Sequence, residues 1–248
     1  MAGSRGLGHA TAQALLQSGL RVTFCSRTNE SLEEAARNLG NPPLARGLQA
    51  DVTDPQALVG ALDAAASDSP IDILVVNSGG PASGGFLSLD TEDWRRGYDT
   101  VVNSAVVAIN CVLPSMLGRG FGRIIVIGSS SVRKPLPNLT LSNVFRPALA
   151  GLVKDLAVAH ASSGVTVNMV SPGKIDTERV ARLDAERARR MELDVPQYRE
   201  QAQKEIPAGR YGTPNEFAAM VRFLASEEAG YITGQSVLID GALTAGHP

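Results

Sequence analysis

The sequence predicts one α/β domain over residues 1–248, a doubly wound parallel sheet covered by helices on both faces, in three layers. Short β-branched runs alternate with helical patterns, and the runs are almost continuously apolar, as expected for strands buried on both faces. No linker, low-complexity segment or internal repeat divides the chain. At 248 residues and 44% hydrophobic, it is long enough to bury one sizeable core.

The expected elements follow one another in strict alternation. Residues 1–19 predict a glycine-rich turn that runs into an amphipathic helix, and residues 29–39 and 54–67 predict two further helices. The expected strands are residues 21–26, 45–52, 71–80, 123–130, 165–173 and 235–240.

Residues 174–210 depart from this alternation, because they are rich in charge and carry only sparse apolar positions. We expect a helical excursion outside the sheet, of the kind that often closes over a ligand. A solvated helical insertion with no binding role remains an alternative.

The glycine-rich turn predicts a phosphate site. Gly6 and Gly8 allow close backbone approach, and the start of the following helix offers free N–H groups. Such a turn normally follows a buried strand, yet only Met1 and Ala2 precede it here. Since that strand would be central, its loss leaves buried backbone groups unpaired at about 1–3 kcal/mol each. We therefore expect the natural chain to begin upstream, with the first strand missing from this sequence.

The end of the strand at residues 21–26 indicates which dinucleotide is bound. A carboxylate near this point would hold the ribose 2′-hydroxyl of NAD, but the chain has Ser26 and Arg27. A guanidinium suits a 2′-phosphate, and Arg5 in the glycine turn adds a second cation. This pattern favours NADP over NAD, although Arg27 alone could be a solvated cation at a strand end.

Composition argues against several other classes. A formal net charge of -2 leaves no basic excess for nucleic acid, and no apolar run approaches the roughly 20 residues that span a membrane. Cys25 and Cys111 lie in apolar surroundings, which predicts reduced thiols and a cytoplasmic protein. The three histidines are scattered, so we expect no metal site.

Several motifs in order resemble the short-chain dehydrogenase/reductases over essentially the whole chain. They are the turn at residues 3–8, Asp51-Val52, the segment 77–80, Ser171-Pro172-Gly173 and the stretch 231–244. Ala2 stands where the family usually has its first glycine. The resemblance implies a Rossmann-like fold, a nicotinamide cofactor, hydride transfer with a carbonyl or hydroxyl compound, and a homotetramer or homodimer. The cofactor-binding positions it implies are Ser4, Arg5, Gly6, Leu7, Gly8, Arg27, Asp51, Val52, Asn77, Ser78, Gly79, Arg146, Pro172, Gly173 and Ile175.

The same resemblance gives the catalytic positions one at a time. The family's serine falls on Ser129, its tyrosine on Ser142, thirteen residues later, and its lysine on Arg146, four residues further on. The family's helix asparagine falls on Val101. The serine is therefore retained, while the tyrosine, lysine and asparagine are replaced.

These replacements alter the expected chemistry. A serine hydroxyl is a far weaker acid than a phenol, and a guanidinium binds and polarises without exchanging protons. A water held by Ser129, Ser142 and Arg146 could deliver the proton, or it could come from the substrate or from residues 174–210, which include Asp176, Glu178 and Tyr198. The sequence leaves these sources open.

Pro147 leaves a further choice open. It either kinks the helix just beyond Arg146 or lies early enough in the helix for its missing N–H not to matter.

The sequence thus predicts an NADP-dependent oxidoreductase, a carbonyl reductase or alcohol dehydrogenase similar to 3-oxoacyl reductases, with a non-standard proton relay. The alternative is a catalytically weak cofactor-binding or regulatory protein of the same fold, in which Ser142 and Arg146 are relicts. A third possibility, a subunit paired with an active paralogue, rests only on the altered site.

Overall fold

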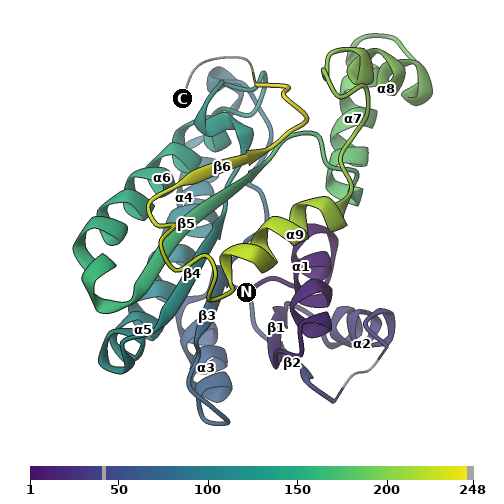
Figure 1. The fold of residues 1–248 in the computed structure, drawn as a ribbon. Helices are drawn as coiled ribbons and strands as arrows, with labels where there is room; N and C mark the ends of the chain where they lie inside the picture. Colours follow the sequence, from purple (N-terminus) through teal and green to yellow (C-terminus); the bar gives the residue numbers. More distant parts are fainter. Residues whose placement is uncertain (41–42, 245–248) are drawn as a thin grey trace.

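The computed structural model describes residues 1–40 and 43–244, and its strands form two parallel sheets (Figure 1). The smaller sheet pairs β1 (Val22–Ser26) with β2 (Ala45–Gln49). The larger sheet has the order β3 (Ile73–Val76), β4 (Gly122–Ile127), β5 (Val165–Pro172) and β6 (Ser236–Ile239). Every expected strand is confirmed, most of them with earlier ends, and the three-layer α/β/α class is confirmed with them.

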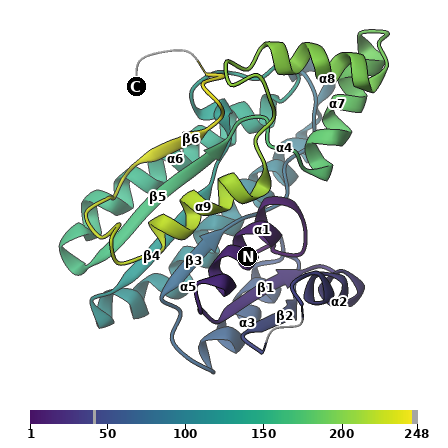
Figure 2. The same ribbon diagram turned by 45° about the vertical axis from the view of Figure 1, so that its right-hand side comes forward.

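Helices cover both faces of these strands (Figures 1 and 2). Side chains of α3 (Pro55–Ala66), α5 (Ser104–Arg119) and α6 (Thr140–His160) form the main core with β3, β4 and β5. On the other face, α1 (Gly6–Gln17) and α9 (Pro214–Leu224) pack against one another and against β4 and β5. The remaining helices are α2 (Asn29–Asn38), α4 (Thr91–Tyr98), α7 (Glu178–Arg190) and α8 (Val195–Lys204).

The helix starts have local causes in the sequence. Asp54 accepts hydrogen bonds from the N–H groups of Gln56 and Ala57 at the start of α3, where Pro55 occupies the first turn. Thr213 and Glu216 form a capping box at the start of α9. These caps satisfy backbone groups that would otherwise face the carboxyl edge of the sheet without partners.

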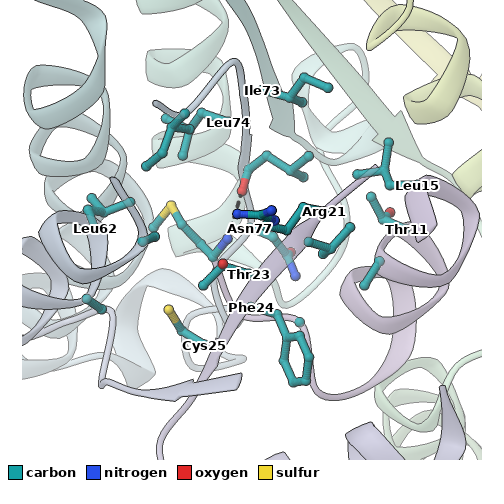
Figure 3. A pocket seen from close by; sticks show the side chains of 18 of the residues that line it. Thr11, Leu15, Arg21, Thr23, Phe24, Cys25, Leu62, Ile73, Leu74 and Asn77 are labelled. Atoms are coloured by element: carbon teal, nitrogen blue, oxygen red, sulfur yellow. Dashed lines mark hydrogen bonds between the residues drawn. The ribbon is translucent and has the colours of Figure 1, made fainter. Parts of the chain in front are cut away.

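The two sheets are separated by a gap between β1 and β3. Residues 1–3 occupy its carboxyl end, where the Gly3 N–H donates to Cys25 O (3.1 Å) and the Ala2 N–H donates to Asn77 O (3.1 Å). Below them lies a cavity of about 240 Å³, lined by residues of β1, β3, α1 and α3 (Figure 3). The structure describes no strand there, and the gap lies where the sequence predicts a missing central strand.

One continuous helical stretch, Thr91–Arg119, joins α4 to α5 through a π-helical turn at Asp99–Asn103. By length and composition alone, this helix could cross a membrane. The sequence analysis did not predict this, because no uninterrupted apolar run within it is long enough. Its buried side, however, includes Ala105, Ile109 and Met116 in the main core. The stretch therefore serves as a core helix of this domain.

The charge-rich segment forms α7 and α8, which extend from the carboxyl edge of the larger sheet (Figure 1). The predicted helical excursion is confirmed. A small core of its own contains Ala188, Tyr198, Ala202, Ile206 and Tyr211. Beside this core, the Tyr211 hydroxyl donates to Oδ2 of the fully buried Asp184 (3.0 Å), which joins α7 to the segment ahead of α9.

Candidate active site and cofactor cleft

The glycine turn brings α1 close to the strands and leaves the helix start open. Gly6 has a φ of +55°, which favours glycine. A Cβ at Gly8 would overlap the Ala2 carbonyl oxygen and come within 2.6 Å of Asn77 Nδ2. Arg5 is the N-cap residue and its side chain makes no capping bond, so the first N–H groups of α1 are available to a phosphate. This arrangement fits the pyrophosphate of a dinucleotide.

The corner expected to bind a 2′-phosphate carries two serines and two arginines. Ser4 Oγ donates to Ser26 Oγ (3.1 Å), which places the neighbouring Arg5 and Arg27 at one corner. Arg27 is exposed, and its guanidinium has no hydrogen-bond partner among the residues that the structure describes. Arg5 instead pairs with Glu34 of α2 (3.1 Å) and Glu178 of α7 (3.9 Å). Arg27 is therefore the readier phosphate ligand.

The other expected cofactor residues lie mainly at strand ends. Asp51 accepts bonds from the N–H and hydroxyl of Thr53 (2.9 and 2.8 Å), and Val52 packs into the main core. Asn77 donates through Nδ2 to Ala2 O (2.5 Å), and the Ser78 hydroxyl donates to the carbonyl oxygen of the adjacent Gly79. The side chain of Asn77 thus fixes Ala2, just ahead of the glycine turn.

The loop after β5 contains the last group of expected cofactor residues. Pro172 ends the strand, and the Gly173 N–H donates to Ile239 O (2.9 Å). A Cβ at Gly173 would come within 2.7 Å of Asp240 Cα, so glycine is required for this close approach. Ile175 is buried and bridges to Gly212. This loop leads directly to Thr177, the N-cap of α7, whose side chain lies near Gly6.

Ser129 and Ser142 are connected through a third serine. Ser129 lies two residues beyond β4, and its Oγ accepts a bond from the Ser131 N–H (3.1 Å). Ser131 Oγ lies 3.3 Å from Ser142 Oγ and donates to the Ser142 carbonyl (3.2 Å). The sequence analysis did not identify Ser131, although the run of three serines at 129–131 was a visible signal.

Arg146 is buried beside the same strand end. Its Nη1 donates to the carbonyl of Ile127, the last residue of β4 (2.7 Å). Burial, and then the charge of Arg179, lower the pKa of Arg146 to about 10, so the guanidinium stays charged at neutral pH. Its charge and its remaining N–H donors suit it to hold an anion or an oxyanion.

Pro147 lies well inside α6, which begins at Thr140. The alternative that it occupies the first turn is therefore wrong. The Asn143 side chain, one turn earlier, forms two hydrogen bonds with the backbone of Leu136 (both 2.9 Å) and so fastens the loop ahead of α6 to the helix.

Arg179 is a second arginine that the sequence analysis did not identify. It lies in the first turn of α7, and its guanidinium rests on Gly80, where a Cβ would overlap it. Surrounding protein atoms, and then Arg182, lower the pKa of Arg179, although the residue is exposed to solvent. A side chain at position 80 would displace the guanidinium from this position.

Parallel strands, a glycine turn, a helix start open to phosphate and polar groups at the carboxyl edge define a dinucleotide-binding protein of the doubly wound class. Comparisons with known proteins narrow this class. The family model described as Enoyl-(Acyl carrier protein) reductase matches residues 1–244. Dehydrogenase/reductase SDR family member 4 of Bos taurus is 32% identical over 249 residues, covering 97% of this chain and 84% of that protein.

Two further similar proteins are reductases by name. The 3-oxoacyl-[acyl-carrier-protein] reductase FabG of Salmonella typhimurium is 33% identical over 245 residues, covering 97% of this chain and 93% of that protein. A crystal structure of a variant actinorhodin polyketide ketoreductase with NADPH superposes with a TM-score of 0.94 at 28% identity, covering 98% of this chain and 95% of that one. The chain belongs to the short-chain dehydrogenase/reductase family and is an oxidoreductase that acts on carbonyl or hydroxyl groups. The predicted resemblance is confirmed.

Proposed function

We propose that this protein is an NADPH-dependent reductase of small carbonyl compounds that uses a non-standard proton relay. The observation that carries the proposal is the position of Arg146, a buried cation bonded to the last residue of β4, two residues before Ser129. In open α/β folds, ligands bind at this carboxyl edge. The relatives named above include reductases, and one of the solved structures contains NADPH.

A nicotinamide dinucleotide would be held by the open start of α1 and by Arg27, and when bound it would supply the hydride for a substrate carbonyl. The charge that develops on the carbonyl oxygen is stabilised by the Arg146 guanidinium and the Ser129 hydroxyl, because both are donors held by the strand end. The Ser131–Ser142 pair holds a water, which passes a proton from bulk solvent to the oxygen, so that no hydroxide is left in the site. Neither serine is acidic enough to replace a phenol, so their role is to position the water rather than to donate directly.

Cofactor choice is proposed to rest on the 2′-phosphate corner. Arg27 is exposed and free to bind, and Arg5 can contribute once it leaves Glu34. A substrate would lie under α7 and α8. The two free thiols, Cys25 and Cys111, favour a cytoplasmic location, and the family resemblance implies a homodimer or homotetramer.

A second candidate function is a cofactor-binding protein with little catalysis. The observation that favours it is the bond between Ser131 Oγ and Ser142 Oγ, which leaves the hydroxyl at the family's tyrosine position already engaged. Removal of a positioned general acid costs about 10²- to 10⁴-fold in rate, which slows a reductase without abolishing it.

Two measurements test the proposal. Fluorescence titration should show tighter binding of NADPH than of NADH, and Arg27→Ala should weaken NADPH binding about 10- to 100-fold while leaving NADH unchanged. A panel of ketones, 3-oxoacyl thioesters and sugars, followed by NADPH oxidation, should give turnover. Binding of neither cofactor would overturn both candidate functions, whereas binding without turnover would favour the second.

A double variant then tests the relay. Ser142→Tyr combined with Arg146→Lys restores the residues usual in the family and should raise kcat. An unchanged kcat would mean that protonation of the oxygen does not depend on the residues at positions 142 and 146.

A further inference from the structure

Two arginines from distant parts of the chain lie at one edge of the larger sheet. Arg146 of α6 donates to the carbonyl of Ile127, which ends β4. Arg179 of α7 rests on Gly80, in the segment that follows β3. Because β3 and β4 are parallel neighbours, with Val76 paired to Val126, these two attachment points lie at the same carboxyl edge.

The segment after β3 connects the elements that carry both arginines. The Gly84 N–H donates to Asn138 O (2.7 Å), and the Thr140 N–H at the start of α6 donates to Gly84 O (3.2 Å). On the other side, Ser83 Oγ donates to Glu186 Oε2 of α7 (3.5 Å). The segment thus holds α6 and α7 together around the edge where the two guanidinium groups lie.

Neither guanidinium has a counter-ion in the part of the chain that the structure describes. No carboxylate oxygen of the described residues lies within 4 Å of either group: Glu178 pairs with Arg5, and Asp184 accepts from Tyr211. Glu186, which accepts from Ser83 Oγ, acts on Arg179 only from a greater distance. The positive charge of Arg179 also contributes to lowering the pKa of Arg146. Two neighbouring cations without a contacting carboxylate favour the binding of an anion between them.

The phosphates of a dinucleotide have their own place in this fold. The start of α1, Gly6 and Gly8 suit the pyrophosphate, and the corner of Arg27 suits a 2′-phosphate. The arginine pair instead accompanies Ser129 and Ser142, the residues beside which the carbonyl would be reduced. Guanidinium groups match a carboxylate through paired N–H donors.

We propose that the substrate carries a carboxylate close to its reducible carbonyl group, bound between Arg146 and Arg179. This inference rests on the proposed function, since it assigns a substrate class, an oxo acid, to the same site. Arg146 serves both the carboxylate and the carbonyl oxygen, while Arg179 serves the carboxylate alone.

The test uses Arg179→Gln, because Arg179 is exposed and makes no hydrogen bond to another described residue, so the variant should fold. The matched control is Arg189→Gln, which removes the same charge from an exposed position near the far end of α7. The probes are 2-oxo-4-phenylbutanoate and its ethyl ester, with NADPH as reductant. In wild type the acid should have the higher kcat/KM. Arg179→Gln should lower kcat/KM for the acid about 10- to 100-fold and change the ester less than threefold.

A binding measurement separates this inference from the proposed function. Calorimetric titration of the protein with NADP⁺ present should show that 4-phenylbutanoate binds more tightly than 4-phenylbutanamide, and that Arg179→Gln abolishes the difference while Arg189→Gln keeps it. If neither oxo compound turns over but this difference is present, carbonyl reduction fails and the anion site stands. Equal binding of acid and amide, equal losses for acid and ester, or a matching loss of NADPH affinity in Arg179→Gln would overturn the anion site.

Discussion

The hydroxyl oxygens of Ser131 and Ser142 lie 3.3 Å apart, so Ser142, at the family's tyrosine position, is held by the last serine of the run at residues 129–131. If this pair holds the water that delivers the proton, Ser142→Ala should lower kcat about 10- to 100-fold without changing the Kd for NADPH. Steady-state NADPH oxidation and fluorescence titration measure the two quantities. Ser162→Ala, an exposed serine just beyond α6, should change neither. An unaltered kcat in Ser142→Ala would remove the serine pair from the relay.

The ion pair between Arg5 and Glu34 predicts a gain in cofactor binding. Glu34→Gln releases a guanidinium at the 2′-phosphate corner, so the Kd for NADPH should fall about two- to fivefold while the Kd for NADH stays constant. The control is Glu33→Gln, which breaks a 3.9 Å pair with Arg37 on the same helix. Equal tightening of both cofactors, or tightening in the control, would assign the effect to overall charge.

Substitution of Gly8 should destabilise the protein for a steric reason. In Gly8→Ala the new Cβ would overlap the Ala2 carbonyl oxygen, so we expect the free energy of unfolding to fall by about 1–3 kcal/mol. Gly60→Ala is the matched control, because nothing lies within 4 Å of a Cβ there and α3 gains a better helix former. Urea unfolding should therefore shift in opposite directions for the two variants. A stable Gly8→Ala protein would show that the turn is looser than the structure describes.

The bond from Tyr211 to Asp184 predicts an alkaline transition. Burial, and then the nearby Asp184 carboxylate, raise the pKa of Tyr211 above the ordinary value near 10. The folded protein therefore retains this proton where the unfolded chain loses it. The stability that Tyr211 provides is fully present below pH 10 and declines as the pH rises further.

Tyr211→Phe should remove this decline and, at neutral pH, lower the free energy of unfolding by about 1–3 kcal/mol, because Asp184 loses its hydrogen-bond donor. Thermal unfolding across pH 8 to 11 checks both effects. Tyr231→Phe, at a fully exposed position, should behave as wild type. Identical pH profiles for Tyr211→Phe and wild type would contradict the assignment.

Thr11 predicts a gain in stability at the cavity between the sheets. Its buried hydroxyl has no hydrogen-bond partner among residues 1–40 and 43–244, and it lies in the cavity wall (Figure 3). Thr11→Val replaces the hydroxyl with a methyl group of similar shape, so the free energy of unfolding should rise by about 1 kcal/mol. Thr100→Val, whose wild-type hydroxyl donates to Arg96 O (2.7 Å), should not be stabilised. A loss in Thr11→Val would indicate that solvent reaches this hydroxyl.

The alternation of apolar runs and helical patterns was sufficient to predict every strand, since parallel strands buried on both faces leave a clear pattern. The order and spacing of the motifs also indicated that Ser129, Ser142 and Arg146 occupy the family's serine, tyrosine and lysine positions. Ser131 and Arg179 were missed because their roles depend on distance in space rather than on spacing. Gly80 is part of a recognisable segment, but only the structure shows which side chain rests on it.

The ion pairs of Arg5 could not be predicted from the sequence either. This residue was expected to be free for phosphate, yet it is paired with acids from α2 and α7 that lie far away along the chain. Salt bridges between exposed groups on separate elements leave no periodic signal, so they become visible only once the helices are packed.

The gap between β1 and β3 divides the backbone hydrogen-bond network, which has a consequence for how the molecule opens. Beyond the hydrogen bonds of residues 1–3, no ladder of described strands joins β1 and β2 to the larger sheet. The connection there is helix packing, chiefly of α1 against α9. Native-state hydrogen exchange should therefore reveal two cooperative units, with the amides of β1 and β2 exchanging faster than those of β4 and β5. The smaller sheet, which leads directly to Arg27, would open first. A dinucleotide bound to both sheets would slow that opening.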